Sequence, residues 1–216
     1  MGNFMNKKFQ SVAVLALALA GLVGCDFESH AAGAANPARV AEMKQTYREL
    51  WLGHIYWVQH AVLTDATSSL AERDAAKKRV DDNTKQIASM LTPFYGEARS
   101  QKFLSLLDIN ISAVREYSEA TVAGNKSQQD AALAHLASNS EDFGAFLSGI
   151  NPYLSESTVR GLIAAHGAHH VLQINQYQKK DYAHLEETWK MMREHVYVIA
   201  DTITAALAKQ FPEKFS

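Results

Sequence analysis

The sequence predicts an all-α protein, an antiparallel bundle of four to six helices that contains an internally duplicated helical hairpin. Every periodic stretch places its apolar residues about 3.6 residues apart, and no stretch alternates as a β-strand does. Capping and helix-breaking residues separate these stretches. Two of the expected hairpins also carry matching residues at a constant offset, which indicates duplication.

Residues 1–24 have the pattern of a bacterial secretion signal. Lys7 and Lys8 give a positive start, and the apolar run after them is too short for a transmembrane helix of roughly 20 residues. The motif LVGC at residues 22–25 resembles the lipobox, in which the cysteine is lipidated and becomes the new N-terminus. We therefore expect a lipid anchor at Cys25, the only cysteine; the alternative is an ordinary secreted protein.

The expected address is the cell envelope, outside the cytoplasm. Asp26 follows the cysteine and resembles the signal that retains Gram-negative lipoproteins in the inner membrane, facing the periplasm. Residues 25–36 are small and polar and predict a tether, which leaves residues 37–216 for the bundle domain. The expected partner is the membrane, through the anchor. Nucleic acid is not expected, because the acidic and basic residues nearly balance and the net charge is -2.

The expected helices follow one another from residue 37 onward. The first starts at Asn36-Pro37, a capping residue and a proline suited to the first turn, and runs to about residue 63. The second stops around residues 93–96, the third ends at Gly124-Asn125, and the fourth ends at residues 151–152. The fifth opens at Ser155, and the sixth runs from near Asp181 to residues 211–212.

Each apolar stripe carries an imidazole or a carboxamide where a core residue is expected. In chain order these positions are His54, Asn83, Asn110, Asn139, His166 and His195, with His170 one turn after His166. The matching offset pairs Asn83 with Asn139 and Asn110 with His166, so the two hairpins predict a bundle with pseudo-twofold symmetry. An extended helical solenoid is the alternative architecture.

This polar layer has three explanations. The side chains can bond to one another, to backbone carbonyls or to buried water, and so fix the register of the helices. They can instead bind a transition metal such as Zn, Cu or Ni, with His54, His166, His170 and His195 as the candidate ligands. Third, the histidines and Asn83, Asn110 and Asn139 can line a pocket for an organic ligand.

Enzymatic function is the least supported class. The chain has no HExxH zinc motif, no repeated ExxH of a di-iron bundle and no CxxCH for covalent haem. It also lacks a GxSxG nucleophile turn and a glycine-rich phosphate loop. Two classes stay open: a binding module, or a non-catalytic scaffold whose outer aromatic face, around Trp57 and His60, meets another envelope protein.

Several phrases resemble a group of small bacterial envelope-associated or secreted helical proteins of unknown function, some of which carry a misleading acetylglutamate kinase label. The similar phrases are LWLGH at 50–54, NSED at 139–142, NP at 151–152, His166, and the tail from His195 through Asp201 to residues 210–215. The resemblance implies a helical bundle and no established activity. In the family pattern a histidine stands where this chain has Asn110, a departure that removes one ligand from a four-imidazole site.

Overall fold

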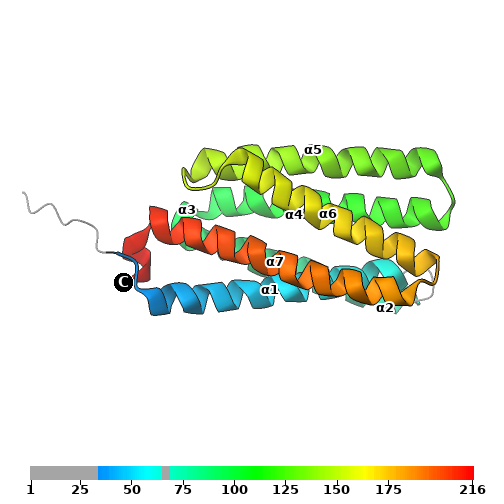
Figure 1. Cartoon of the computed structure of the whole chain (residues 1–216), viewed down its shortest axis with the longest axis horizontal. Helices are drawn as coiled ribbons and strands as arrows, with labels where there is room; N and C mark the ends of the chain where they lie inside the picture. Colours follow the sequence, from blue (N-terminus) through cyan, green and yellow to red (C-terminus); the bar gives the residue numbers. More distant parts are fainter. Residues whose placement is uncertain (1–33, 65–68) are drawn as a thin grey trace, which may run out of the picture. The chain divides into compact units, whose positions relative to one another are not determined.

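The computed structural model describes residues 34–64 and 69–216, and in this part of the chain seven α-helices pack together without any strand. The predicted all-α class is confirmed. Long helices that follow one another along the chain run in opposite directions (Figure 1). The elements are α1 Pro37–Thr64, α2 Leu70–Ser89, α3 Thr92–Tyr95, α4 Glu97–Val122, α5 Lys126–Ile150, α6 Glu156–Gln178, α7 Tyr182–Gln210 and the 3-10 turn η1 Pro212–Phe215.

Side-chain caps start the helices where the sequence places them. The carboxamide oxygen of Asn36 accepts a hydrogen bond from the Ala38 N–H at 2.9 Å at the start of α1. Ser155 caps α6, and Asp181 caps α7, each by accepting a bond from a backbone N–H three residues later. Ser69 and Glu72 form a reciprocal capping box on α2. Each cap stabilises its helix by about 1 kcal/mol.

Two short elements were not predicted. Both α3 and η1 are four residues long, and each has a proline near its first position, Pro93 and Pro212. A four-residue turn is too short to show a hydrophobic period, so only the prolines mark it in the sequence. Gly124 ends α4 as expected: its φ of 66° lies in the left-handed region that glycine adopts without strain.

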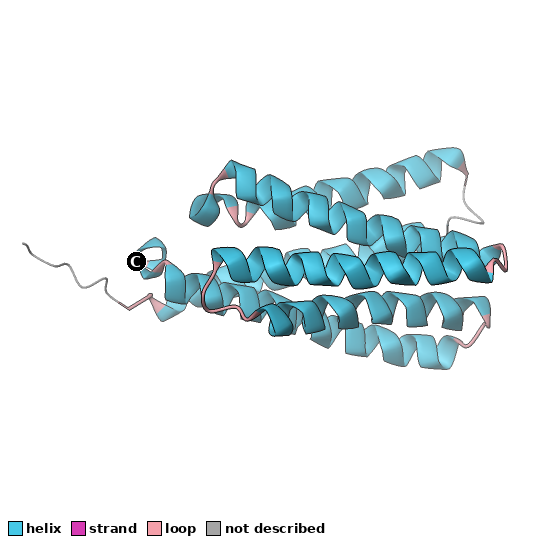
Figure 2. Ribbon diagram, turned by 90° about the horizontal axis from the view of Figure 1, so that it is seen from above, coloured by secondary structure: helices cyan, strands magenta, loops and turns pink. Residues whose placement is uncertain are grey.

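The long helices close into a ring. α1 packs on α2, α2 on α4, and so on through α5 and α6 to α7, which returns to α1. α1, α4 and α6 also contact one another, so these three helices face the centre of the bundle. Figure 2 shows the helices from a second direction. At the α1–α7 seam, the Arg48 guanidinium donates two hydrogen bonds to the Asp201 carboxylate, at 2.7 and 2.6 Å.

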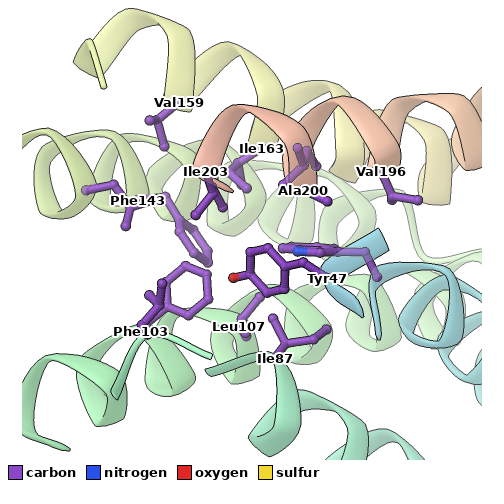
Figure 3. Packing of buried hydrophobic residues seen from close by; sticks show 14 of the residues in the cluster. Tyr47, Ile87, Phe103, Leu107, Phe143, Val159, Ile163, Val196, Ala200 and Ile203 are labelled. Atoms are coloured by element: carbon purple, nitrogen blue, oxygen red, sulfur yellow. The ribbon is translucent and has the colours of Figure 1, made fainter. Parts of the chain in front are cut away.

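The interior contains two apolar clusters. The large apolar cluster includes Trp51, Phe103 and Phe143, and the rings of the two phenylalanines meet edge to face at 5.6 Å (Figure 3). The small apolar cluster is built around Val58, Val114, Leu136 and Ile174. Burial of these side chains is the main stabilising contribution to the bundle.

Some predictions fall outside the described residues: the signal at 1–24, the lipid anchor at Cys25, the retention signal at Asp26 and the tether as far as residue 33. None of the described helices is long and apolar enough to cross a membrane. The tether's last residues, 34–36, precede α1, and the Asn36 N–H donates a hydrogen bond to the Phe215 carbonyl at 2.9 Å.

Candidate metal centre

On four of the helices the predicted polar position lies between the two apolar clusters. Along α4, for example, Leu107 belongs to the large apolar cluster and Ala113 to the small one, and Asn110 stands between them. α2, α5 and α6 repeat this order. The polar layer therefore crosses the middle of the core, where an unpaired polar atom is costly. Its fully buried members are His54, Asn83, Asn110, Asn139, His166 and His170.

The asparagine half of this layer is hydrogen-bonded. Asn139 donates to the Leu106 carbonyl at 3.0 Å, and its own carboxamide oxygen accepts from Asn110 at 2.9 Å. Asn83 donates in the same way to the Leu50 carbonyl at 3.0 Å, but its own carboxamide oxygen is buried without a hydrogen bond in the described part of the chain. Each of these bonds joins a side chain of one helix to its neighbour in the same hairpin, so it fixes the register of the two helices.

The histidine half brings three imidazoles together. His54 of α1 and His166 of α6 stack with ring centres 5.6 Å apart, and His170, one turn along α6, meets the His166 ring edge-on at 4.7 Å. One ligand atom of each imidazole lies within 4.8 Å of the others. A tetrahedral zinc ion with Zn–N bonds of 2.0–2.1 Å needs nitrogens about 3.4 Å apart. Side-chain rotations that bring the nitrogens little more than about 1 Å closer together would therefore satisfy such an ion.

The nitrogens of this group lack protein partners. Within the described part of the chain, Nδ1 of His54, both nitrogens of His166 and Nε2 of His170 are buried without a hydrogen bond. Leaving one such group unpaired costs about 1–3 kcal/mol. Several unpaired nitrogens at one point indicate a site that a further group, an ion or water, completes.

The electrostatics keep these imidazoles neutral. Burial lowers the pKa of His54 to about 4, while the neighbouring Asn83 carboxamide acts in the opposite direction. Burial lowers the pKa of His170 to about 3. The pKa of His166 lies well below its ordinary value because of burial and, after that, the neighbouring imidazoles. A neutral imidazole is the form that binds a metal ion, so the site is prepared for a cation at neutral pH.

Trp51 forms one wall of the site. Its ring meets His54 edge to face at 5.5 Å and His166 at 5.7 Å, and its side chain is completely buried. This contact follows from helix geometry on α1, where Trp51 and His54 are three residues apart and share a face. Trp51 was not among the predicted site residues.

His195 does not join the group of three, which corrects the expectation that it would share their ion. Its Nε2 is 2.8 Å from the Leu162 carbonyl oxygen, and its ring centre is 6.4 Å from that of His166. The ring is only partly buried, and it faces His169 at 5.2 Å instead. The 3.6-residue period shows which face a residue is on, but not how far its ring reaches across to the next helix.

The other three histidines of the described residues are exposed. His60, His135 and His184 all lie on the surface. His135 pairs with Glu116 at 2.9 Å, and His184 with Asp181. A groove of about 770 Å³ opens between α1, α2 and α4, but its walls are charged and aliphatic and include none of the layer histidines.

No protein-family model, curated protein or solved structure matches this chain. The resemblance to the envelope-associated helical proteins therefore stays a prediction. What the site can do follows from its own residues: three neutral imidazoles beside a tryptophan wall, in the buried core of the bundle.

Proposed function

We propose that the bundle binds a divalent transition metal, Zn, Cu or Ni, through His54, His166 and His170. The observation that carries this proposal is the meeting of three buried imidazoles, four of whose six nitrogens have no hydrogen bond within the described chain. Imidazole nitrogen suits these three metals, whereas Mg and Ca prefer oxygen. Three protein ligands leave a fourth position for water or an incoming molecule.

A metal fits the geometry better than an organic ligand does. The nitrogens are already within 4.8 Å of one another, which is space for an ion and not for a larger molecule. The groove of about 770 Å³ is lined by residues other than the layer histidines. The pocket alternative would need a cavity at His54 and His166, and Trp51 packs against both rings there.

The polar layer recurs at a regular interval in three helical hairpins, which supports a common role for its members. The carbonyls of Leu50, Leu106 and Leu162 each accept from a side chain 33 residues later, which is Asn83, Asn139 and His195 in turn. Each of these contacts lies 56 residues after the one before it. The same step relates the three central positions on α1, α4 and α6, which are His54, Asn110 and His166.

The predicted duplication paired the second expected helix with the third and the fourth with the fifth, which are α2–α4 and α5–α6. The 56-residue step supports a different division into three units, α1–α2, α4–α5 and α6–α7. Asn110 occupies the third central position, and its carboxamide is engaged by Asn139. The ring of central positions therefore supplies two imidazoles, and His170 supplies the third from the next turn of α6. This arrangement accounts for a metal site that is displaced toward α1 and α6.

The lipobox supports placing this site in the cell envelope, on a lipoprotein anchored through Cys25. Cys25→Ala should release the domain into the soluble envelope fraction, because nothing else in the sequence predicts an anchor. Fractionation and the globomycin sensitivity of processing measure this. If the variant stays in the membrane fraction and globomycin does not alter cleavage of the wild-type signal sequence, the anchor proposal is wrong.

Elemental analysis and native mass spectrometry of the untagged domain test the metal proposal directly. Thermal melts with added Zn, Cu and Ni extend the test, because a ligand present at 100 times its Kd stabilises the native state by about 2.7 kcal/mol. His166→Asn should abolish this stabilisation, and His135→Asn, at an exposed histidine, should leave it intact. If none of the three metals changes the melting temperature of the wild-type domain, the proposed site is refuted.

A scaffold function is the second candidate, favoured by an aromatic face on the outside of α1. Trp57 and His60 lie edge to face at 6.4 Å, and Tyr56, 52% exposed, packs against Trp57 at 4.8 Å. The polar layer would then only fix the register of the helices. In that case added metal would stabilise neither the wild type nor His166→Asn. Cross-linking in the intact envelope should lose a specific product in Trp57→Ser but not in His135→Ser.

A further inference from the structure

His195 is held so that one particular nitrogen faces away from the backbone. Its Nε2 lies 2.8 Å from the Leu162 carbonyl oxygen, which can only accept a hydrogen bond. Nε2 therefore carries the proton and donates, and Nδ1 keeps its lone pair. A hydrogen bond of this kind fixes the tautomer and the ring orientation of metal-binding histidines. In the other two hairpins the same place is taken by Asn83 and Asn139, whose carboxamides have no ring and so offer no second nitrogen.

His169 stands opposite this ring. The two ring centres are 5.2 Å apart, and both side chains are half-buried, between solvent and core. Nδ1 of His169 is buried and, among the described residues, has no hydrogen-bond partner. The pair therefore joins a histidine with a fixed tautomer to one with an unpaired nitrogen.

A continuous series of imidazoles links this pair to the inner site. His195 stacks on His166 with ring centres 6.4 Å apart and an angle of 20° between the planes. His166 in turn contacts His54 and His170. The series begins at half-buried rings on the α6–α7 seam and ends at rings that are 2–3% exposed.

We propose that His169 and His195 form an outer capture site for the divalent transition metal, and that the α6–α7 seam is its way into the inner site. This inference rests on the proposed metal binding by His54, His166 and His170. A site closed within a core needs an entry path, and two imidazoles at its mouth lower the barrier by replacing water ligands in steps. His195 is then a transfer ligand and not a permanent one.

The fluorescence of Trp51 follows the filling of the inner site. Cu²⁺ and Ni²⁺ quench an indole in contact with them, and Trp51 touches two of the three inner histidines. In the background Trp57→Phe/Trp189→Phe, Trp51 is the only tryptophan left. Stopped-flow mixing with Ni²⁺ then gives the loading rate, mixing of the loaded protein with EDTA gives the release rate, and titration gives the Kd.

His195→Asn is the matched variant, because Asn83 and Asn139 show that asparagine makes the carbonyl bond at this place in a hairpin. We expect His195→Asn and His169→Ala to slow both loading and release by roughly tenfold or more, with Kd changed less than about twofold, since an entry path alters rates and not the equilibrium. His135→Ala should load like the wild type.

Three results overturn the inference, and they are distinguishable. Loading and release at wild-type rates in both variants show that the metal enters elsewhere. A loss of affinity in His195→Asn as large as in His54→Asn shows that His195 is a permanent inner ligand. If the parent protein shows no saturable quenching by Ni²⁺ or Cu²⁺, the proposed metal binding itself fails, and the entry path fails with it.

Discussion

The two halves of the polar layer are equally buried but differ in how their polar atoms are satisfied. Asn110 and Asn139 are 4% and 1% exposed, and the bond between them is continued to the Leu106 carbonyl. His54 and His166 are both 2% exposed, yet three of their four ring nitrogens have no hydrogen bond within the described chain. Burial alone therefore does not account for the difference.

The asparagine half shows what register specification needs, which is one short chain of hydrogen bonds between neighbouring helices. The histidine half exceeds that need and leaves buried groups unpaired, which lowers the stability of the metal-free protein. Such a cost is understandable where the unpaired groups serve a ligand. The following changes alter one half of the layer at a time.

Acid should have the largest effect, and it should act through the histidine half. Burial lowers the pKa of His54 to about 4 and that of His170 to about 3, so between these values and about 6.5 the unfolded chain binds more protons than the native one. Stability is therefore complete above pH 6.5 and falls as the pH decreases. His54 alone contributes a loss of roughly 3 kcal/mol by pH 4.

Chemical denaturation in the presence of EDTA at a series of pH values measures this loss without interference from metal. His54→Asn should flatten the slope between pH 6.5 and 4, because asparagine does not titrate. An acid limb that is equally steep in the wild type and in the double variant His54→Asn/His170→Asn would contradict the assignment.

Asn139→Ala should have the next largest effect, because it opens the satisfied half. The change leaves the buried Asn110 amide without a partner, at about 1–3 kcal/mol, and removes a second bond to the Leu106 carbonyl, which keeps its bond within α4. Asn83→Ala is the matched control, since Asn83 makes only one of the two bonds. Urea unfolding should therefore show a smaller loss for Asn83→Ala, and equal losses would mean that the Asn110 bond contributes nothing.

The helices were largely predictable because their determinants are local. Ser155 and Asp181 are polar caps, Gly124 adopts a positive φ, and the stripes have the helical period. The pairing of His166 with His170 was also within reach, since residues four apart on a helix share a face. The short helix α3 was missed because a single turn carries no period.

The partners across helices were not predictable in the same way. The sequence placed His54 and His195 alike on inward stripes, but His54 reaches the cluster while His195 reaches the Leu162 carbonyl. The choice depends on the distance between helices and on side-chain rotamers, which the spacing of residues does not contain. For the same reason the closed pair of Asn110 and Asn139 was seen only as two members of one layer.

Asn110→His should have the smallest effect on free energy and the most specific one, because it converts part of the satisfied half into the open kind. The new imidazole would stand at the position on α4 that matches His54 on α1 and His166 on α6. It removes the bond to Asn139, so the metal-free protein should lose about 1 kcal/mol.

With metal, Asn110→His should bind more tightly, because a fourth imidazole can replace the water in the open position. We expect roughly a tenfold lower Kd for Ni²⁺, which corresponds to about 1.4 kcal/mol. Titration of Trp51 fluorescence measures the Kd, and Asn139→His is the control, since it removes the same bond but adds its imidazole on α5, outside the ring of central positions. Equal affinities in the two variants would mean that the centres of α1, α4 and α6 do not converge on one ion, and that the unpaired nitrogens of His54 and His166 need another explanation.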